Sequence, residues 1–115
     1  MENPSFWLGK KVKVKIDRPL GSKHPDYDLI YPVNYGYIQG IIAGDGEEID
    51  AYVLGPEKAI SEFEGLVIAI VKRKDDNENK LVVANHRYSK EEIKKLINFQ
   101  EKYFKHQIIQ KKAKI

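Results

Sequence analysis

The chain has 115 residues, of which 42% are hydrophobic and 32% are charged, and it contains no cysteine. This composition is typical of a globular domain with its own apolar core, and it excludes a disulfide scaffold, thiol catalysis and zinc sites built on thiolates. The net charge of +3 is too small to indicate nucleic-acid binding by itself.

The first half of the chain is predicted to form short β-strands separated by turns. Polar and apolar residues alternate over Lys11–Ile16, and this period of two with β-branched residues is typical of a half-buried strand. Residues 17–25 are rich in turn formers and predict a loop. The segment Tyr31–Ile42 is aromatic and apolar but is interrupted by Gly36 and Gly40, which predicts a strand with a bulge or a sharp bend.

Three more short strands are expected after an acidic turn at residues 44–48. They cover Ile49–Leu54, Leu66–Lys72 and Leu81–Ala84, and a polar turn at residues 74–79 precedes the last of them. Five or six short strands joined by tight turns are the pattern of a small closed or partly closed barrel.

One amphipathic helix is predicted near the end of the chain. Ser89 and Glu92 have the spacing of a capping box. A stripe of mainly apolar side chains follows at helical spacing, at Ile93, Leu96, Ile97, Gln100, Tyr103 and Phe104. We expect this stripe to pack on the sheet of the same domain. The predicted fold is therefore α+β and mainly β, a small OB-like Greek-key β-barrel of five to six strands with a C-terminal amphipathic helix.

The two ends of the chain bear on its organisation and location. Residues 1–11 lack the apolar run of a signal peptide, and the longest apolar stretch, Leu66–Val71, is far shorter than the ~20 residues that cross a bilayer. The C-terminal lysines predict a solvated basic tail at about residues 107–115. We therefore expect a single domain over residues 1–115, located in the cytoplasm and without a membrane partner.

The acidic turn is the most informative stretch for function. If Ile49 begins a strand with its side chain toward the core, Asp50 points to the opposite face. Two glycines permit a tight turn that places Asp45 and Glu47 at the same rim. Three converging carboxylates repel one another unless a cation neutralises them, and Mg²⁺ prefers such oxygen ligands. The alternative is an ordinary solvated hairpin turn, because Asp-Gly pairs are common connectors.

The segment Tyr31–Ile38, which precedes this turn, reads YPVNYGYI and resembles a motif of the soluble inorganic pyrophosphatases. In that family a Tyr-Pro-x-Asn-Tyr-Gly-Tyr-Ile segment precedes Asp-Gly-Asp-x-x-Asp, whose three aspartates bind metal. Asp45, Glu47 and Asp50 stand here in the same order and at the same spacing. The resemblance extends from about Lys11 to Tyr103 and is strongest in the middle of the chain.

This resemblance implies a Mg²⁺-dependent enzyme that hydrolyses pyrophosphate to two phosphates through a metal-activated water. It implies a homo-oligomer, as is common in the family. The metal ligands are expected among Asp45, Asp50, Asp75, Asp76 and Glu78. The expected catalytic residues are Asp50, Tyr35 and Glu47, which stands where the family's general base sits. The expected phosphate ligands are Arg18, Lys23, Lys80 and Tyr103.

Two departures from the family pattern keep other functions open. Glu47 replaces the middle aspartate and reaches one methylene further, and Phe104 replaces a lysine beside Tyr103. The first alternative is a metal-dependent hydrolase of a nucleotide or another phosphate compound. The second is a non-catalytic barrel that binds nucleic acid or phosphate ligands. The acidic turn argues against a nucleic-acid partner, because its carboxylates would repel a phosphate backbone.

Overall fold

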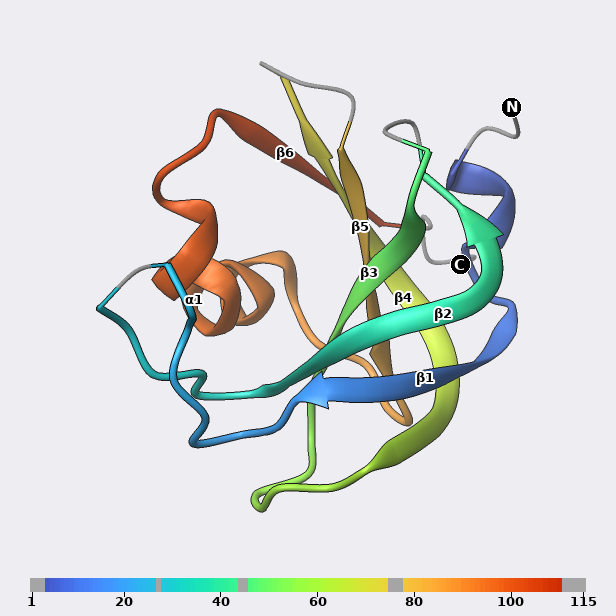
Figure 1. The fold of residues 1–115 in the computed structure, drawn as a ribbon. Helices are drawn as coiled ribbons and strands as arrows, with labels where there is room; N and C mark the ends of the chain where they lie inside the picture. Colours follow the sequence, from blue (N-terminus) through green and yellow to red (C-terminus); the bar gives the residue numbers. More distant parts are fainter. Residues whose placement is uncertain (1–3, 27, 44–45, 75–77, 111–115) are drawn as a thin grey trace.

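The computed structural model describes residues 4–26, 28–43, 46–74 and 78–110. In chain order its elements are the short helix η1 (Pro4–Trp7), β1 (Lys11–Arg18), β2 (Asn34–Ile42), β3 (Glu48–Val53), β4 (Glu62–Arg73), β5 (Asn79–Ala84), α1 (Lys90–Glu101) and β6 (His106–Gln110). The strands follow the order β1-β2-β3-β5-β4-β6 in one sheet, and pairing of β1 with β4 closes the first five into a barrel (Figure 1). The predicted barrel of five to six strands with a C-terminal helix is confirmed.

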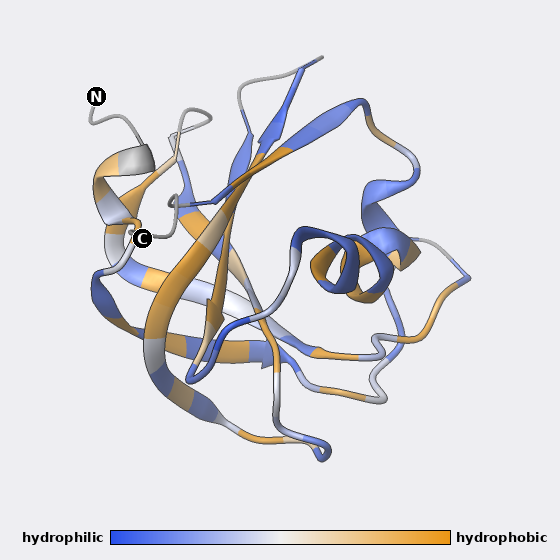
Figure 2. Ribbon diagram, turned by 180° about the vertical axis from the view of Figure 1, so that it is seen from behind, coloured by the Kyte–Doolittle hydropathy of each residue, from blue (hydrophilic) through white to orange (hydrophobic). Residues whose placement is uncertain are grey.

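The inside of the barrel forms one of two apolar cores. The alternation predicted for Lys11–Ile16 is confirmed, because Val12 and Val14 are buried in this core while the three lysines that alternate with the apolar residues are exposed. In β3, Ile49 and Ala51 also point inward. Figure 2 shows hydrophobic bands along the barrel strands with hydrophilic and neutral bands between them, and α1 also carries both colours.

The second core lies between the outer face of the barrel and α1. Tyr35 and Tyr52 contribute to it from neighbouring strands, and Ile93 and Ile97 contribute from the helix. The capping box predicted at the start of α1 is present: the backbone N–H of Glu92 donates to Ser89 Oγ, and that of Ser89 donates to Glu92 Oε1. The helical stripe therefore packs on the sheet of the same domain, as predicted.

The end of the chain differs from the prediction. The helix ends at Glu101, so placing Tyr103 and Phe104 in its stripe was wrong; the chain turns there and then runs antiparallel to β4 as β6. Residues 107–110, expected in a solvated tail, lie in this strand and pair with residues 69–72 of β4, so that they cover an otherwise open edge of the long strand. Residues 111–115 of the predicted tail lie outside the described residues.

The connection between β1 and β2 packs beside α1, although the two segments are far apart in the sequence (Figures 1 and 2). Tyr31 in this connection is buried, with its ring centroid 5.3 Å from that of Phe99. Within β2, a Cβ on Gly36 would overlap the carbonyl oxygen of Lys15, and Gly40 has a φ of +87°. The bend predicted from these glycines is confirmed by the irregular register of β2 and β3. In the described part of the chain, no helix is long and apolar enough to span a bilayer.

Candidate active site

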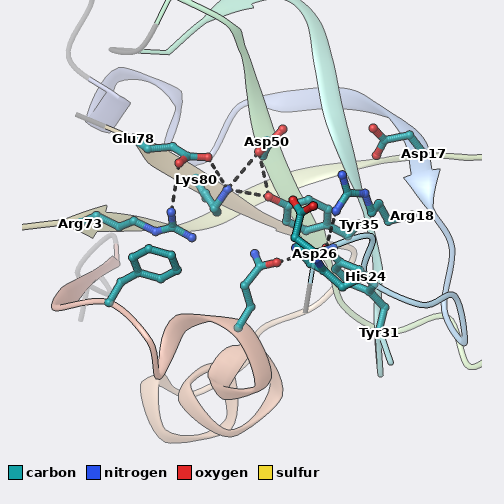
Figure 3. Close-up of a pocket in the computed structure, with 12 residues that line it drawn as sticks. Asp17, Arg18, His24, Asp26, Tyr31, Tyr35, Asp50, Arg73, Glu78 and Lys80 are labelled. Carbon is teal, nitrogen blue, oxygen red and sulfur yellow. Dashed lines mark hydrogen bonds and ion pairs between the residues drawn. The ribbon is translucent and has the colours of Figure 1, made fainter. Parts of the chain in front are cut away.

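A cleft of about 270 Å³ opens on the outer face of the barrel, between the strands, the β1–β2 connection and the end of α1 (Figure 3). Twelve residues line it. Among them are five that the sequence predicted as site residues: Arg18, Tyr35, Asp50, Glu78 and Lys80.

Strand register determines which of these side chains meet. Because Ile49 and Ala51 point into the barrel, Asp50 between them points outward, as predicted. Asp50 pairs with Lys80 in the parallel ladder of β3 and β5. On the other side of β3, Tyr35 pairs with Tyr52, which stands two residues after Asp50 on the same outer face.

Lys80 is the centre of the cleft's hydrogen-bond network. Only 2% of the residue is exposed. Its ammonium donates to Tyr35 Oη at 2.6 Å, to Asp50 Oδ2 at 2.9 Å and to Glu78 Oε1 at 2.7 Å. Two carboxylates and a hydroxyl therefore compensate the cost of burying this charge.

Tyr35 also contacts Asp50 directly, donating its hydroxyl proton to Oδ2 at 2.8 Å. Burial and the negative charge of Asp50 raise the pKa of Tyr35 well above its ordinary value of 10.0. The hydroxyl therefore stays protonated at neutral pH and remains a hydrogen-bond donor.

Arg73 forms a second group of contacts at the end of β4. Its Nε and Nη2 donate to the two carboxylate oxygens of Glu101, at 3.1 and 2.9 Å. Its Nη1 donates to Glu78 Oε2 at 3.0 Å, and its guanidinium carbon lies 3.7 Å from the ring centroid of Phe104. Arg73 thus connects the fully buried Glu101 of α1 with Glu78, a carboxylate of the cleft.

Further hydrogen bonds of Glu101 and Gln100 extend this network to Arg18. Tyr52 donates to Glu101 Oε2 at 2.6 Å and accepts from Gln100 Nε2 at 2.7 Å. Tyr31 donates to Gln100 Oε1 at 3.1 Å and accepts from Arg18 Nη1 at 3.0 Å. A chain of hydrogen bonds through the buried end of α1 therefore links the cations on the two sides of the cleft.

Three other predicted site residues, which the structure describes, are not brought into the cleft. Lys23 is exposed in the β1–β2 connection, Glu47 is exposed in the turn before β3, and Tyr103 is exposed beyond the end of α1. None of these three lines the cleft. Asp45, Asp75 and Asp76 lie outside the described residues.

Several residues of the site were missed by the sequence reasoning, namely Asp17, His24, Asp26, Tyr31, Arg73, Gln100, Glu101 and Phe104. Glu101 carried a usable signal. It comes four residues after Ile97, so it lies on the buried face of the predicted helix, and a buried carboxylate requires a cationic partner. The sequence alone gives no comparable sign for Arg73 or Asp17.

The oxygen atoms around Lys80 suit a hard divalent cation. Asp50, Glu78 and Tyr35 converge on the Lys80 ammonium, Glu78 is paired with Arg73 as well, and carboxylate oxygens are the ligands that such metals prefer. Burial raises the pKa of Asp17 and the nearby charge of Asp50 raises it further, against the opposing effect of Arg18. Among the described residues, which lack Asp45, Asp75 and Asp76, no three acidic, histidine or cysteine side chains are grouped closely enough to hold a metal.

The fold and the site together define a small barrel protein with an outer-face cleft that mixes carboxylates, cations and tyrosine hydroxyls. The inorganic pyrophosphatase family model matches residues 7–112. The chain therefore belongs to the inorganic pyrophosphatase family.

Individual relatives agree with this assignment. An inorganic pyrophosphatase of Gluconobacter oxydans is 31% identical over 86 residues, which are 68% of this chain and 50% of that protein. One from Caulobacter vibrioides is 38% identical over 56 residues, 45% of this chain and 32% of that protein. The chain thus spans half or less of the length of these curated relatives.

Solved structures support the fold. The inorganic pyrophosphatase of Ehrlichia chaffeensis superposes with a TM-score of 0.70 and 15% identity, over 95% of this chain and 88% of that chain. One from Neisseria gonorrhoeae gives a TM-score of 0.62 and 22% identity, over 83% and 76% of the two chains. At such low identity the likeness concerns the barrel fold, which agrees with the predicted OB-like class.

Proposed function

We propose that this chain is a Mg²⁺-dependent inorganic pyrophosphatase, which hydrolyses pyrophosphate to two phosphates by attack of a water molecule. The observation that carries the proposal is the convergence of Asp50, Lys80 and Tyr35 in one cleft of a chain that belongs to this family. Arg18 and Glu78 line the same cleft. Pyrophosphate is a compact polyanion, and its binding requires cations and hydrogen-bond donors placed close together.

Asp50 and Glu78 are the described carboxylates that we propose as metal ligands, with Asp45, Asp75 and Asp76 as further ligands proposed from the sequence. A divalent cation bound there supplies charge neutralisation and a water of lowered pKa. Glu47 remains the general base proposed from the family resemblance.

Lys80 and Arg18 are proposed to hold phosphate oxygens from two sides of the cleft. Lys80 carries a compact charge with three donors, whereas the Arg18 guanidinium offers paired N–H groups that suit two oxygens of one phosphate. Tyr35, held in the protonated form, donates its one proton to Asp50 Oδ2, and we propose that it redirects this proton to the same anion when the anion binds. Such donors favour hydrolysis where they stabilise the charge that develops on the leaving phosphate. Lys23 and Tyr103 stay predictions from the sequence.

The proposal is tested by phosphate release from pyrophosphate, measured with Mg²⁺ and with excess chelator. We expect release by the wild-type chain with Mg²⁺ alone, and a loss of at least about 100-fold in kcat/KM for Asp50→Asn. Asp28→Asn, an exposed aspartate outside the cleft, is the matched control and is expected to keep the wild-type rate. Absence of release by the wild-type chain would contradict the proposal.

Parallel assays with ATP address the first alternative function. Equal or faster phosphate release from ATP than from pyrophosphate would assign the cleft to a nucleotide or another phosphate compound. We expect pyrophosphate to be preferred, because the cations of the cleft are arranged around a volume of about 270 Å³ that suits a small anion.

The same proposal includes a cytoplasmic location and assembly into a homo-oligomer. The absence of cysteine is compatible with a reducing compartment. Assembly rests on the family resemblance, and light scattering on the purified chain measures the number of subunits.

A further inference from the structure

The guanidinium of Arg73 lies in the wall of the cleft. Its positive charge has no role in the proposed hydrolysis. The residue lines the cleft together with Asp50, Glu78 and Lys80, and only 6% of it is exposed. Its side chain forms ion pairs with Glu78 at 3.0 Å and with Glu101 at 2.9 Å. One guanidinium thus bridges a carboxylate of the cleft and a carboxylate of the protein interior.

The position of this guanidinium is fixed by its surroundings. Two of its nitrogens bind both oxygens of Glu101, which is itself fully buried and also accepts a hydrogen bond from Tyr52. Phe104 covers one face of the guanidinium at 3.7 Å. Moving Arg73 away would leave Glu101 buried without its cation, which is strongly unfavourable.

Lys80 differs from Arg73 in this respect. Its ammonium ends a flexible stem, and its hydrogen-bond partners in the described part of the chain, Tyr35, Asp50 and Glu78, all belong to the cleft. An incoming divalent cation can replace the ammonium on these oxygens. The charge of Arg73 has no such freedom and stays beside Glu78.

We propose that Arg73 is a resident cation of the cleft that holds one carboxylate oxygen of Glu78 and weakens the binding of divalent metal at the Asp50–Glu78 pair. Glu78 Oε2 is engaged by Arg73, so a metal ligates Glu78 through Oε1 alone or displaces the arginine. In either case the metal binds beside a fixed positive charge, which repels it. This inference rests on the proposed function, in which a divalent cation binds at these carboxylates.

The test is the affinity for Mg²⁺ alone, measured by calorimetry on chelator-treated protein in the absence of pyrophosphate. Arg73→Met alone would leave Glu101 as an unpaired buried carboxylate and risks unfolding the protein. We therefore compare Glu101→Gln with the double variant Arg73→Met/Glu101→Gln. Both lack the buried carboxylate, and they differ only in the presence of Arg73.

The double variant is expected to bind Mg²⁺ at least about tenfold more tightly than Glu101→Gln, because one positive charge beside Glu78 is gone. Lys72→Met removes an equal charge from the neighbouring exposed position of β4 and is expected to change the affinity less than about twofold. Equal or weaker binding by the double variant would overturn the proposal, as would a Lys72→Met effect of the same size. Because no pyrophosphate is present, the result does not depend on whether the chain hydrolyses it.

Discussion

Three charged side chains of the described residues are buried, and all three belong to the cleft or to its support: Lys80, Arg73 and Glu101. Each has at least two polar partners within 3.1 Å. Buried ion pairs of this kind contribute little net stability compared with apolar side chains of the same volume, but losing one partner is costly. Their placement beside a cleft therefore points to a role in the chemistry of the site.

The buried carboxyl of Glu101 is expected to make the stability of the fold depend on pH in the acid range. Burial by itself raises the pKa of this carboxyl, but hydrogen bonds from Arg73 and Tyr52 outweigh burial and hold the pKa below its ordinary value of 4.5. A carboxyl with a lowered pKa in the folded state stabilises the fold above its unfolded-state pKa, and this contribution is lost as the pH falls through the folded-state value.

We therefore expect the free energy of unfolding to decrease as the pH falls below 4.5, and to decrease less steeply in Glu101→Gln. Urea unfolding at a series of pH values measures both slopes. Glu91→Gln, an exposed carboxyl on the same helix, is the control and should keep the wild-type slope. A Glu101→Gln slope equal to that of the wild type would show that the Arg73–Glu101 pair does not contribute to acid stability.

The sequence could predict some of the site residues and not others. Local patterns, namely a strand alternation and the motifs of the family, contain Asp50, Tyr35 and Lys80. The register of the strands then brings these three side chains together. Arg73 and Glu101 are 28 positions apart, and their contact depends on where the helix ends relative to the end of β4. No local pattern contains that information.

At the scale of elements, α1 is the part that holds one side of the cleft in place. Its last turn supplies Gln100 and Glu101, and its first turn is fixed by the capping box of Ser89 and Glu92. The start of the helix was predictable because a capping box is local in sequence. Its end was not, because the following segment leaves the helix to pair with β4, and periodicity carries no information about that edge.

Ser89→Ala is expected to lower the free energy of unfolding by about 1 kcal/mol, because the backbone N–H of Glu92 loses its acceptor. Ser89→Gly should cost only about a few tenths of a kcal/mol, since glycine is tolerated at this position. Urea denaturation of the two variants gives both values. Equal stability of Ser89→Ala and the wild type would indicate that the cap does not support the helix.

At the scale of the whole molecule, α1 packs on one outer face of the small barrel and covers only part of that face. The uncovered part of that face becomes the cleft, lined by residues of five strands, by the β1–β2 connection and by the end of α1. The barrel class was predictable from strand number and turn spacing. The pairing of β1 with β4, which closes the barrel, and the pairing of β6 with β4 join segments that are distant in the sequence. The order of the elements along the chain does not determine these pairings.

The proposed binding and hydrolysis of pyrophosphate in this cleft are tested most directly at the buried Lys80. The measurement is kcat/KM for pyrophosphate with Mg²⁺ in the wild-type chain, in Lys80→Gln and in Lys72→Gln, an exposed lysine of β4. We predict a loss of at least about 100-fold for Lys80→Gln, with an unchanged circular dichroism spectrum, and a rate within about twofold of the wild type for Lys72→Gln. A folded Lys80→Gln variant with the wild-type rate would contradict the assignment of the activity to this cleft.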